Sequence, residues 1–381
     1  MPHASDHPHT QDDLRHMQRA LALAEQALWI TSPNPRVGCV IVNAAGQALG
    51  EGHTQQAGQA HAEIMALRAA QSAGHSTQGA TAYVTLEPCS HQGRTGPCCD
   101  ALVQAGVTRV VASVRDPNPA VAGRGFAHLQ DHAIQVDVGL CEAEAIELNL
   151  GFFKRMQHAQ PWVRLKVAAS LDGQTALHNG VSQWITSEPA RADGHAWRAR
   201  ACAVLTGIGT VLEDDPRLDV RAVITPRQPV LIVIDSRLET PLEAKLFLRD
   251  AGIERDVWIY CAVEDAARRA ALQAKGAQVM CLPNPHGKVD LRLMLADLAR
   301  RHINEVHVEA GHKLNGSLLR EGWVDELLLY QAPLLMGQGR GLTNLGPFET
   351  LTQAVPLQLH DVTRIGPDLR ILARRAPVAS P

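Results

Sequence analysis

Apolar and polar residues follow two different periods along the first 150 residues. Leu14, Met17 and Leu21 recur at the spacing of one helix face, which predicts a helix over residues 12–28. Stretches rich in β-branched residues and bounded by turn residues predict strands. The further elements expected here are strands at 37–42, 47–53, 80–86 and 109–114, and helices at 61–73 and 98–104. Because helices and strands alternate, the pattern indicates an α/β sandwich that is complete within residues 1–150.

A second α/β series of different pattern begins near residue 162. Residues 151–161 (GFFKRMQHAQP) are expected to link it to the first series, and the glycine-rich residues 337–341 are expected to form a flexible turn. No segment repeats at a fixed period, so we predict two different domains, 1–150 and 162–381, rather than a duplication. The expected strands are 162–168, 203–206, 230–234, 257–261, 278–281, 305–309 and 327–333, and helices are expected at 264–275 and 291–301.

Composition and charge limit the kinds of partner and the location expected for this chain. Its 381 residues include 36 Lys and Arg against 39 Asp and Glu, a formal net charge of −3 that argues against a surface built to grip nucleic acid. Apolar runs such as Val230–Ile234 are far shorter than the roughly 18 residues of a membrane span. Residues 1–13 are polar and lack the apolar segment of a signal peptide, and eight cysteines are too few for a disulfide scaffold. A cytoplasmic location is therefore expected.

Three short motifs in the first half offer the ligands of a zinc ion. His61 and Cys98 each open a predicted helix, and Cys89 follows a predicted strand. One imidazole and two thiolates make a tetrahedral zinc set with the fourth position left for water. Glu63 lies two residues after His61, where its carboxylate can reach that water without binding the metal. Zinc lowers the pKa of such a water to near 7, so Glu63 is expected to take up and relay its proton.

The spacing of the two cysteines leaves two explanations open. Zinc nucleobase deaminases carry P-C-x-x-C, whereas eight residues separate Cys89 from Cys98. Either the zinc is structural, with Cys99 or His91 as a fourth ligand, or residues 90–97 (SHQGRTGP) serve a particular substrate. Because the motif and its strand–helix context agree, the residues favour a catalytic zinc.

The quoted motifs can be compared with known families. The relevant segments are Pro33-Asn34-Pro35-Arg36-Val37-Gly38-Cys39, Gly50-Glu51-Gly52-His53, His61-Ala62-Glu63, and Glu87-Pro88-Cys89-Ser90-His91 followed by Gly93-Arg94-Thr95 and Cys98. They resemble the deaminase half of the bifunctional riboflavin-biosynthesis deaminase/reductase family, which shows the same eight-residue spacing. The resemblance implies a cytidine-deaminase-like α/β/α sandwich in which His61, Cys89 and Cys98 bind zinc and Glu63 moves protons.

The same resemblance implies a pyrimidine pocket lined by Asn34 and His53. Without it, Asn34 between two prolines fits a turn equally well, and His53 fits a packed hairpin residue. Arg94 is a solvated loop charge on the simplest reading, but its guanidinium could grip a substrate phosphate with two hydrogen bonds.

Glycines at strand ends in the second half offer turns that could hold phosphate. Gly207-Ile208-Gly209-Thr210 and Glu309-Ala310-Gly311 each follow a predicted strand and precede a predicted helix, whose backbone amides can bind an anion. Taken alone, a tight turn explains each equally well. Together with residues 165–173, 182–186 and 214–218, they resemble the reductase half of the same family. That half implies a dihydrofolate-reductase-like α/β domain with NADPH as cofactor.

The resemblance also assigns residues to the two ligands of the reductase. Arg198 and Arg221 would supply charge for a ribose phosphate and Trp184 a flat face for a ring, although a core tryptophan and two surface arginines remain the alternative. His312-Lys313 departs from the pattern of relatives, which leaves the cofactor contact there open. The substrate residues are Ser182, Arg198, Leu218, Arg221 and Glu309, and the NADPH residues are Ala168, Trp184, Thr210, Asp214, Ser236, Gly311, His312, Lys313, Leu314, Asn315, Gly316 and Ser317.

The function implied by the resemblance is a two-step conversion in riboflavin biosynthesis. The first domain would hydrolytically deaminate 2,5-diamino-6-(5-phosphoribosylamino)pyrimidin-4(3H)-one, and the second would use NADPH to reduce the ribosyl group to ribityl. The partner expected is this small pyrimidine ribose phosphate, with no nucleic acid and no membrane, and the chain is expected to form a homo-oligomer. The alternatives are a nucleoside or tRNA deaminase fused to a folate-type reductase, and a zinc-stabilised module without enzymatic activity.

Overall fold

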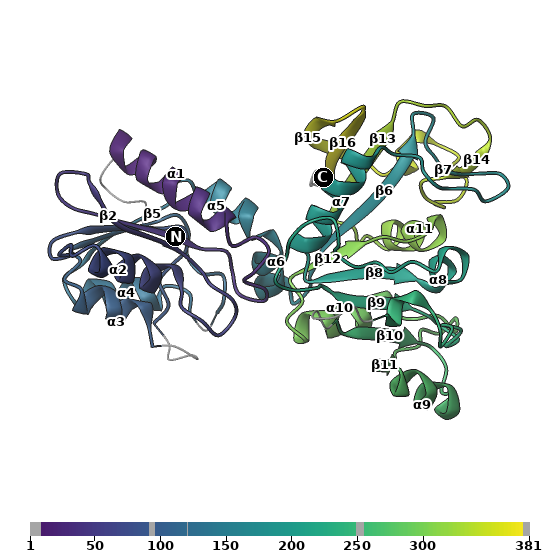
Figure 1. Ribbon diagram of the computed structural model, residues 1–381, viewed down its shortest axis with the longest axis horizontal. Helices are drawn as coiled ribbons and strands as arrows, with labels where there is room; N and C mark the ends of the chain where they lie inside the picture. Colours follow the sequence, from purple (N-terminus) through teal and green to yellow (C-terminus); the bar gives the residue numbers. More distant parts are fainter. Residues whose placement is uncertain (1–8, 91–95, 120, 249–254, 376–381) are drawn as a thin grey trace. The chain divides into compact units, whose positions relative to one another are not determined.

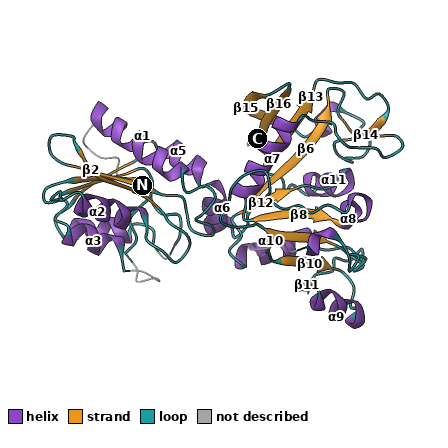
Figure 2. Cartoon of the chain, in the orientation of Figure 1, coloured by secondary structure: helices purple, strands orange, loops and turns teal. Residues whose placement is uncertain are grey.

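The computed structural model describes residues 9–90, 96–119, 121–248 and 255–375 of the chain. Contacts between Cα atoms divide the chain into unit 1, Met1–Ala159, and unit 2, Gln160–Pro381. Each unit has its own sheet with helices packed against it (Figures 1 and 2). The two units are described separately below.

Unit 1 is built on a five-stranded mixed sheet. Its strands are β1 (Gly38–Val42), β2 (Ala48–His53), β3 (Thr81–Val84), β4 (Arg109–Ala112) and β5 (Gln135–Val138), in the order β2-β1-β3-β4-β5. Strand β1 pairs antiparallel with both β2 and β3, whereas β3, β4 and β5 run parallel. The hairpin predicted over residues 37–53 is confirmed as β1–β2, with Gly38 opposite His53.

Helices cover both faces of this sheet. They are α1 (Gln11–Glu25), α2 (Ala62–Ser72), α3 (Cys98–Gln104), α4 (Arg124–Asp131), α5 (Glu142–Leu148) and α6 (Leu150–His158). Figure 1 shows α1 and α5 on one face and α2, α3 and α4 on the other. Helix α1 begins at a capping box, in which the Thr10 hydroxyl accepts from the Asp13 amide at 3.0 Å and the Asp13 carboxylate accepts from the Thr10 amide at 2.8 Å.

The period of two in β1 sends its side chains into two separate cores. Cys39 and Ile41 pack in the cluster that contains α2, and Val40 and Val42 pack in the cluster that contains Met17 of α1. A strand buried on both faces reads as a continuous apolar run, which is the pattern of GCVIV. The α/β/α sandwich expected from the sequence is therefore present in unit 1.

The stretch expected to link the domains is a helix. Helix α6 covers Leu150–His158 and lies in unit 1, where Phe152 and Phe153 are buried in the same cluster as Cys39. The two rings meet edge to face with centroids 6.2 Å apart. Because these two residues belong to the core of unit 1, the boundary between the two compact units falls after Ala159.

Unit 2 is built on a nine-stranded sheet that is parallel over most of its width. The order is β11-β10-β9-β8-β12-β6-β13-β16-β15, and every neighbouring pair from β11 to β13 is parallel, whereas β13–β16 and β16–β15 are antiparallel. A separate two-stranded sheet pairs β7 with β14. The strands are β6 (Trp162–Ser170), β7 (Gln174–Leu177), β8 (Ala203–Gly207), β9 (Val230–Ile234), β10 (Val257–Cys261), β11 (Ala277–Cys281), β12 (Glu305–Val308), β13 (Glu326–Ala332), β14 (Gly339–Gly341), β15 (Leu357–Ile365) and β16 (Asp368–Arg375).

Helices connect the parallel strands of unit 2. They are α7 (Glu188–Arg200), α8 (Ile208–Asp214), α9 (Ala266–Ala274), α10 (Leu291–Arg300) and α11 (His312–Arg320), with short 3-10 turns at Lys245–Phe247 and Leu351–Gln353. The Ser187, Asp265 and Asp290 side chains cap α7, α9 and α10 by accepting from a backbone amide in the first turn. Helices α8 and α11 follow β8 and β12 directly, so both begin at the carboxyl ends of neighbouring parallel strands.

All seven strands predicted for the second half are present, and the two predicted helices correspond to α9 and α10. The antiparallel hairpin β15–β16 and the small strand β7 were not predicted. Residues 339–341, expected to belong to a flexible turn, form β14 and pair with β7. The pairing requires close approach, since a Cβ on Gly339 would lie 2.3 Å from the carbonyl oxygen of Ala176.

Candidate active sites

Three side chains from separate segments of unit 1 meet around one point. His61 is the N-cap of α2, Cys98 is the first residue of α3, and Cys89 lies in the loop after β3. The His61 Nδ1 atom is 3.6 Å from the Cys89 sulfur and 3.4 Å from the Cys98 sulfur. Within the part of the chain that the structure describes, these three side chains form the one cluster with metal-ligand spacing, all ligand atoms lying within 4.8 Å of one another.

The donor set fits a zinc ion. The Cys98 side chain, and then His61, lower the pKa of the Cys89 thiol to about 4, so that sulfur is ready as a thiolate. The hydrogen bond to Cys89 in turn raises the pKa of His61. One imidazole nitrogen and two sulfurs suit zinc, and three protein ligands leave the fourth position open, as catalytic sites do.

Glu63 lies in the first turn of α2 and is buried beside this cluster, with 4% of its surface exposed. Burial, and then the charge of Cys89, raise the pKa of its carboxyl group to about 7. Its carboxylate does not belong to the three-residue cluster. A carboxyl group that titrates near neutral pH is suited to take up and release protons.

The loop that carries Cys89 is held by a carboxylate that the sequence analysis did not single out. Buried Glu87 accepts hydrogen bonds from the backbone amides of Asp116 at 3.1 Å, Gly123 at 2.9 Å and Gly125 at 2.9 Å. The chains approach closely there, because a Cβ on Gly125 would lie 2.1 Å from the carbonyl oxygen of Pro88. In the sequence, Glu87 stands directly before Pro88-Cys89, so it was taken as part of the zinc motif and not as a residue with a role of its own.

Cys99 faces away from the cluster. Its thiol donates to the carbonyl oxygens of Pro88 at 3.2 Å and Gly125 at 3.5 Å, and the residue is fully buried in the core. Cys99 is therefore not placed to serve as a fourth zinc ligand, and His91, the other fourth ligand considered, lies outside the described residues. Arg94, the candidate for phosphate binding, also lies outside the described residues.

The two candidates for the pyrimidine pocket lie at the ends of their segments. His53 is the last residue of β2, and burial lowers its pKa. The preceding residue, Gly52, packs closely against α2, since a Cβ on Gly52 would lie 2.7 Å from the carbonyl oxygen of Ala62. The end of β2 therefore lies beside the first turn of α2, which follows His61. Asn34 is half-buried, and its backbone N–H donates to the carbonyl oxygen of Thr31 at 2.8 Å in a turn.

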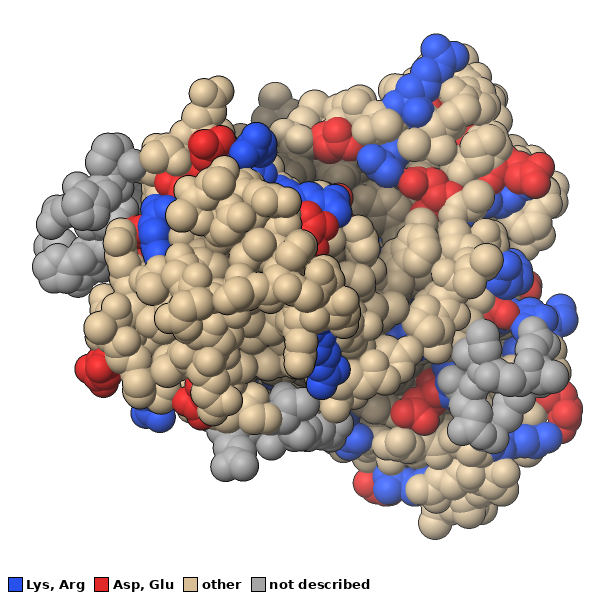
Figure 3. Space-filling view, turned by 60° about the vertical axis from the view of Figure 1, so that its left-hand side comes forward, with Lys and Arg blue, Asp and Glu red and all other residues tan. Residues whose placement is uncertain are grey.

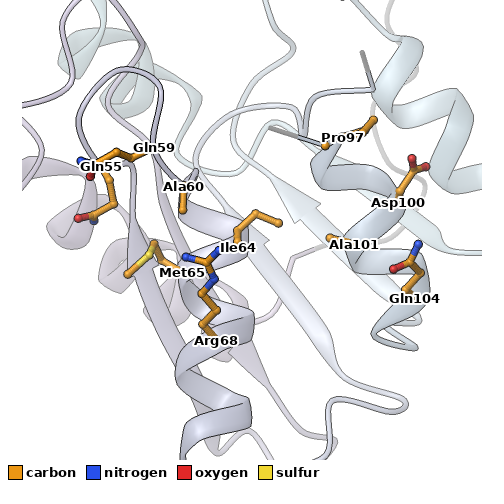
Figure 4. A pocket seen from close by; sticks show the side chains of 11 residues that line it. Gln55, Gln59, Ala60, Ile64, Met65, Arg68, Pro97, Asp100, Ala101 and Gln104 are labelled. Atoms are coloured by element: carbon orange, nitrogen blue, oxygen red, sulfur yellow. The ribbon is translucent and has the colours of Figure 1, made fainter. Parts of the chain in front are cut away.

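A groove of about 880 Å³ also runs between α2 and α3 (Figure 4). Ile64 and Arg68 of α2 face Ala101 and Gln104 of α3 across it, and Gln59 lies at one end. None of the residues that line it belongs to the predicted site. The groove therefore lies along the flank of the helices whose first turns carry the cluster.

The second site is a cavity of about 430 Å³ in unit 2, beside the carboxyl ends of β8 and β12. Most of the predicted residues meet there. Those that line it are Ala168, Ser182, Trp184, Arg198, Thr210, Asp214, Leu218, Arg221, Glu309, Gly311, His312 and Asn315. The predicted residues that do not line it are Ser236, Lys313, Leu314, Gly316 and Ser317.

Four of these five residues have contacts within the protein, and the Ser317 hydroxyl donates to the carbonyl oxygen of Lys313 at 3.2 Å. The Ser236 hydroxyl accepts from the Val289 backbone amide at 3.3 Å. The Leu314 side chain packs against Gly207, since a Cβ on Gly207 would lie 3.2 Å from it. A Cβ on Gly316 would lie 2.0 Å from the carbonyl oxygen of Asn344, so this glycine permits close packing of α11.

Glu309 is the main negative charge in the deeper part of the cavity. Its carboxylate is 2.7 Å from Arg198 Nε and 3.5 Å from Lys166 Nζ. Burial favours the neutral acid, but Arg198 and then Lys166 hold the pKa of Glu309 well below its usual range. Lys166 lies in the motif of residues 165–173 but was not among the predicted site residues, because a lysine in a strand gives no chemical signal by itself.

The exposure of Trp184 and Arg198 differs from that of a core tryptophan and a surface arginine. Trp184 is 67% exposed and stacks against Arg191 at 4.6 Å, so it is not a core residue. Arg198 is almost buried rather than on the surface, whereas about half of the Arg221 side chain is exposed. Arg221 pairs with Asp219 at 2.6 Å.

Two family models match the chain, one for each unit. The model of the cytidine and deoxycytidylate deaminase zinc-binding region matches residues 10–114, and that of the RibD C-terminal domain matches residues 161–371. Together with the zinc-type cluster and the cavity, they define the class: a bifunctional protein with a zinc-dependent deaminase domain followed by a reductase domain.

Relatives of known name match over nearly the whole length. Riboflavin biosynthesis protein RibD of Escherichia coli (strain K12) is 46% identical over 371 residues, which cover 94% of this chain and 98% of the relative. The RibD protein of Aquifex aeolicus (strain VF5) is 40% identical over 363 residues, with 95% and 98% covered. The chain belongs to the RibD family.

Solved structures agree. Acinetobacter baumannii RibD, form 1, superposes with a TM-score of 0.87 at 41% identity, covering 96% of this chain and 99% of that one. The Thermotoga maritima protein described as a diaminohydroxyphosphoribosylaminopyrimidine deaminase/5-amino-6-(5-phosphoribosylamino)uracil reductase has a TM-score of 0.85 at 30% identity, with the same coverage. The fold class expected from the sequence is confirmed.

The chain is accordingly a bifunctional deaminase and reductase of riboflavin biosynthesis, and its cofactors are Zn²⁺ and NADPH. It acts on a small pyrimidine substrate. A deaminase fused to an unrelated folate-type reductase does not account for two halves that match one family end to end. Among the described residues, no helix combines the length and the apolar character needed to cross a bilayer.

Proposed function

We propose that unit 1 deaminates 2,5-diamino-6-(5-phosphoribosylamino)pyrimidin-4(3H)-one with the zinc ion held by His61, Cys89 and Cys98. The observation that carries this proposal is the convergence of one imidazole and two thiols within 4.8 Å, next to a buried carboxyl group. Zinc, when bound, supplies a water molecule whose pKa is lowered to near 7. Asn34 and His53 hold the pyrimidine ring at the entrance to this site.

Glu63 moves the protons of the reaction. It takes the proton of the attacking water, delivers it to the ring nitrogen, and then assists the departure of ammonia from the amino-bearing carbon. Since burial raises the pKa of Glu63 to about 7, both its protonated and its ionised forms are accessible near neutral pH. The carboxylate of Glu87 keeps the Cys89 loop in place through its bonds to Asp116, Gly123 and Gly125.

We propose that unit 2 transfers hydride from NADPH to C1′ of the ribosyl group while the C1′–O4′ bond breaks and O4′ takes up a proton from water, which gives the ribityl group and NADP⁺. No side chain forms a covalent bond in this step, and positioning and charge suffice. The substrate contacts Ser182, Arg198, Leu218, Arg221 and Glu309, which all line the cavity. NADPH contacts Ala168, Trp184, Thr210, Asp214, Ser236 and the segment 311–317.

We further propose that each activity belongs to one domain, the deaminase to residues 1–150 and the reductase to residues 162–381, joined by the segment 151–161, most of which is helix α6 of unit 1. Since Phe152 and Phe153 pack in the core of unit 1, a division after Ala159 keeps both cores whole.

The chain is further proposed to act in the cytoplasm as a homo-oligomer, without nucleic acid or membrane partners. Strand β15 supports self-association, because it lies at the sheet edge and exposes Leu357, Leu359 and Val362. Acidic and basic side chains are interspersed on the face shown in Figure 3, which is a poor match for a nucleic-acid backbone. Light scattering and a labelled-tRNA shift at low salt test these two points.

The full-length protein supplied with the diaminopyrimidine phosphate provides the central test. Without NADPH it should release ammonia, and with NADPH it should also oxidise the cofactor once the ring has been deaminated. Cofactor oxidation before ammonia release would reverse the proposed order. Release of ammonia from cytidine or tRNA in place of this substrate would favour the alternative deaminases.

A further inference from the structure

One buried histidine lies next to the reductase cavity without lining it. His307 is the third residue of β12, its side chain is fully enclosed, and its Nε2 atom is 3.5 Å from Glu309 Oε1. Glu309 lines the cavity, whereas His307 does not. An effect of His307 on the substrate would therefore pass through the carboxylate of Glu309.

The side chains along β12 alternate between an apolar and a polar face of the sheet. Val306 and Val308 pack in the apolar core of unit 2. Glu305, His307 and Glu309 are the alternate residues, so they point to the opposite face. His307 thus lies between two carboxylates of its own strand, and one of them belongs to the cavity.

The other neighbours of His307 offer its ring no acceptor. Its register partners are Arg164 on β6 and Val204 on β8, a cation and an apolar side chain. The Glu305 carboxylate is already 3.2 Å from Arg164 Nη1. Under ordinary hydrogen-bond geometry neither ring nitrogen has a partner among the described residues. A buried N–H without a partner is costly, which leaves the nearby carboxylate of Glu309 as the acceptor.

The electrostatic surroundings keep the imidazole neutral. Burial lowers the pKa of His307, and although Glu309 opposes this shift, the charges of Arg164 and Arg198 add to it. A neutral imidazole carries its single N–H on one of its two nitrogens. A bare Nε2 would direct its lone pair at the carboxylate oxygen of Glu309, so the geometry favours the tautomer protonated at Nε2.

The two oxygens of Glu309 have different numbers of partners. Oε1 lies 2.7 Å from Arg198 Nε and 3.5 Å from His307 Nε2, whereas Oε2 lies 3.5 Å from Lys166 Nζ. A carboxylate oxygen accepts about two hydrogen bonds, so Oε1 is fully engaged by protein groups and Oε2 keeps one position. The contact with His307 is longer than an ordinary hydrogen bond, and such contacts in active sites often shorten when substrate binds.

We propose that His307 is a positioning residue of the reductase, whose Nε2–H fixes Oε1 of Glu309 so that Oε2 accepts a hydrogen bond from a hydroxyl or N–H group of the pyrimidine substrate. This inference rests on the proposed function of unit 2, in which Glu309 contacts the substrate. It adds to that function a residue that touches neither the substrate nor NADPH.

The kinetic test compares two substitutions in the full-length zinc- and NADPH-loaded protein. His307→Leu removes the donor and should raise KM for 5-amino-6-(5-phosphoribosylamino)uracil about fivefold to tenfold, the effect of losing one hydrogen bond. His307→Gln keeps an N–H that can reach Oε1, so its KM should stay within about twofold of the wild type. In both variants kcat and KM for NADPH should stay within about twofold, because the lost interaction serves binding of the pyrimidine alone.

Two controls separate positioning from packing. In a Glu309→Gln background, His307→Leu should change KM for the pyrimidine by less than about twofold, because the carboxylate that it positions is gone. Val306→Ala removes packing from the apolar face of the same strand, where Val306 is fully buried. It should lower the unfolding temperature and leave KM for the pyrimidine unaffected.

A measurement on the wild-type protein tests the tautomer without a change in packing. In protein labelled with ¹⁵N-histidine, the His307 ring should carry its proton on Nε2, and its signals are identified by their absence from the spectrum of His307→Gln. These signals should shift when the deaminated pyrimidine is added without NADPH, and should stay in place when NADPH is added alone.

Three outcomes would overturn the inference. They are a ring protonated at Nδ1, an undiminished effect of His307→Leu in the Glu309→Gln background, and an equal rise of KM in Val306→Ala. Wild-type protein that neither binds nor reduces the pyrimidine would instead contradict the proposed function of unit 2. Because the tautomer is measured without turnover, the two failures are distinguishable.

Discussion

The deaminase and reductase sites of this chain are built in opposite ways. The first gathers three ligands within 4.8 Å, from residues 61 to 98, against a buried carboxyl group. The second is a cavity of about 430 Å³ whose lining comes from residues as far apart as Lys166 and Arg340. A metal needs a few ligands at fixed distances, whereas a large substrate and a dinucleotide need many weak contacts. Loss of one ligand atom should therefore abolish activity at the first site, whereas loss of one contact should only weaken ligand binding at the second.

Replacement of the third zinc ligand should have the largest effect. Cys98→Ser should lose zinc and with it all deamination, because Cys98 belongs to the cluster. Its neighbour provides the matched control: Cys99→Ser should keep its zinc, since the Cys99 thiol points to the carbonyl oxygen of Pro88. Metal content and ammonia release measure both. Zinc retained in Cys98→Ser and lost in Cys99→Ser would contradict the ligand assignment.

Next in size is the loss of the proton carrier. Glu63→Gln should reduce deamination by about 10²–10⁴-fold, the usual contribution of general acid–base catalysis. Zinc content and reductase activity should be unchanged, because Glu63 lies outside the ligand cluster. Metal analysis of the purified variant distinguishes the roles: loss of zinc would make Glu63 a ligand.

In the reductase site, a single truncation should weaken binding without abolishing activity. Arg198→Ala removes the guanidinium 2.7 Å from Glu309 and should weaken binding of the pyrimidine substrate by about 1.5–3 kcal/mol. KM for NADPH should hardly change. A rise in KM for NADPH with an unchanged KM for the pyrimidine would mean that the cavity is divided differently between the two ligands.

A smaller effect concerns the acid stability of unit 2. Burial, and then the charges of Arg198 and Arg221, lower the pKa of His195 from 6.5 to about 4. Between these two values the unfolded chain binds a proton that the folded chain does not, so stability falls as the pH drops from 6.5 towards 4. From pH 7 to pH 5 this histidine should cost about 2 kcal/mol of unfolding free energy. Denaturant titrations of the wild type and of His195→Gln should differ by that pH-dependent amount, and parallel curves would contradict the assignment.

The smallest expected change follows from cutting between the two sites. A fragment of residues 160–381 should fold, reduce the deaminated substrate with NADPH and need no zinc, because its core contains no residue of unit 1. A parallel fragment starting after residue 165 would remove part of β6, at the middle of the sheet, and should fail. An inactive but folded 160–381 fragment would mean that the reductase depends on the deaminase.

Sequence patterns predicted the two α/β series because both depend on short-range periodicity. The β-branched run at residues 37–42 predicted a strand, and α10 repeats its apolar residues with a helical period. The hairpin β15–β16 escaped prediction because its outer strand is mostly exposed and carries no buried alternation. Helix α6 was taken for a linker because Lys154, Arg155 and the terminal Pro161 mask the two buried phenylalanines.

The same contrast applies to the sites. His61, Cys89 and Cys98 were singled out by the ligand chemistry of zinc, and the family resemblance favoured Cys98 over its neighbour Cys99. In the reductase, the cavity residues were identified through family resemblance, and Lys166 and Arg217, which both line the cavity, were missed. Charged side chains at such positions look like any surface charge until the fold brings Lys166 to Glu309 and Arg217 to Asp219.

The position of β6 in its sheet has a consequence for the order in which the two activities appear during synthesis. Unit 1 ends at Ala159, so it can fold as soon as that residue leaves the ribosome. Strand β6 comes directly afterwards, but its neighbours β12 and β13 begin only at Glu305 and Glu326. At roughly 5–20 residues per second, β6 waits on the order of ten seconds with its edges unpaired. The growing chain therefore carries a finished deaminase well before a reductase exists, and this interval is when it is most exposed to aggregation and most dependent on chaperones.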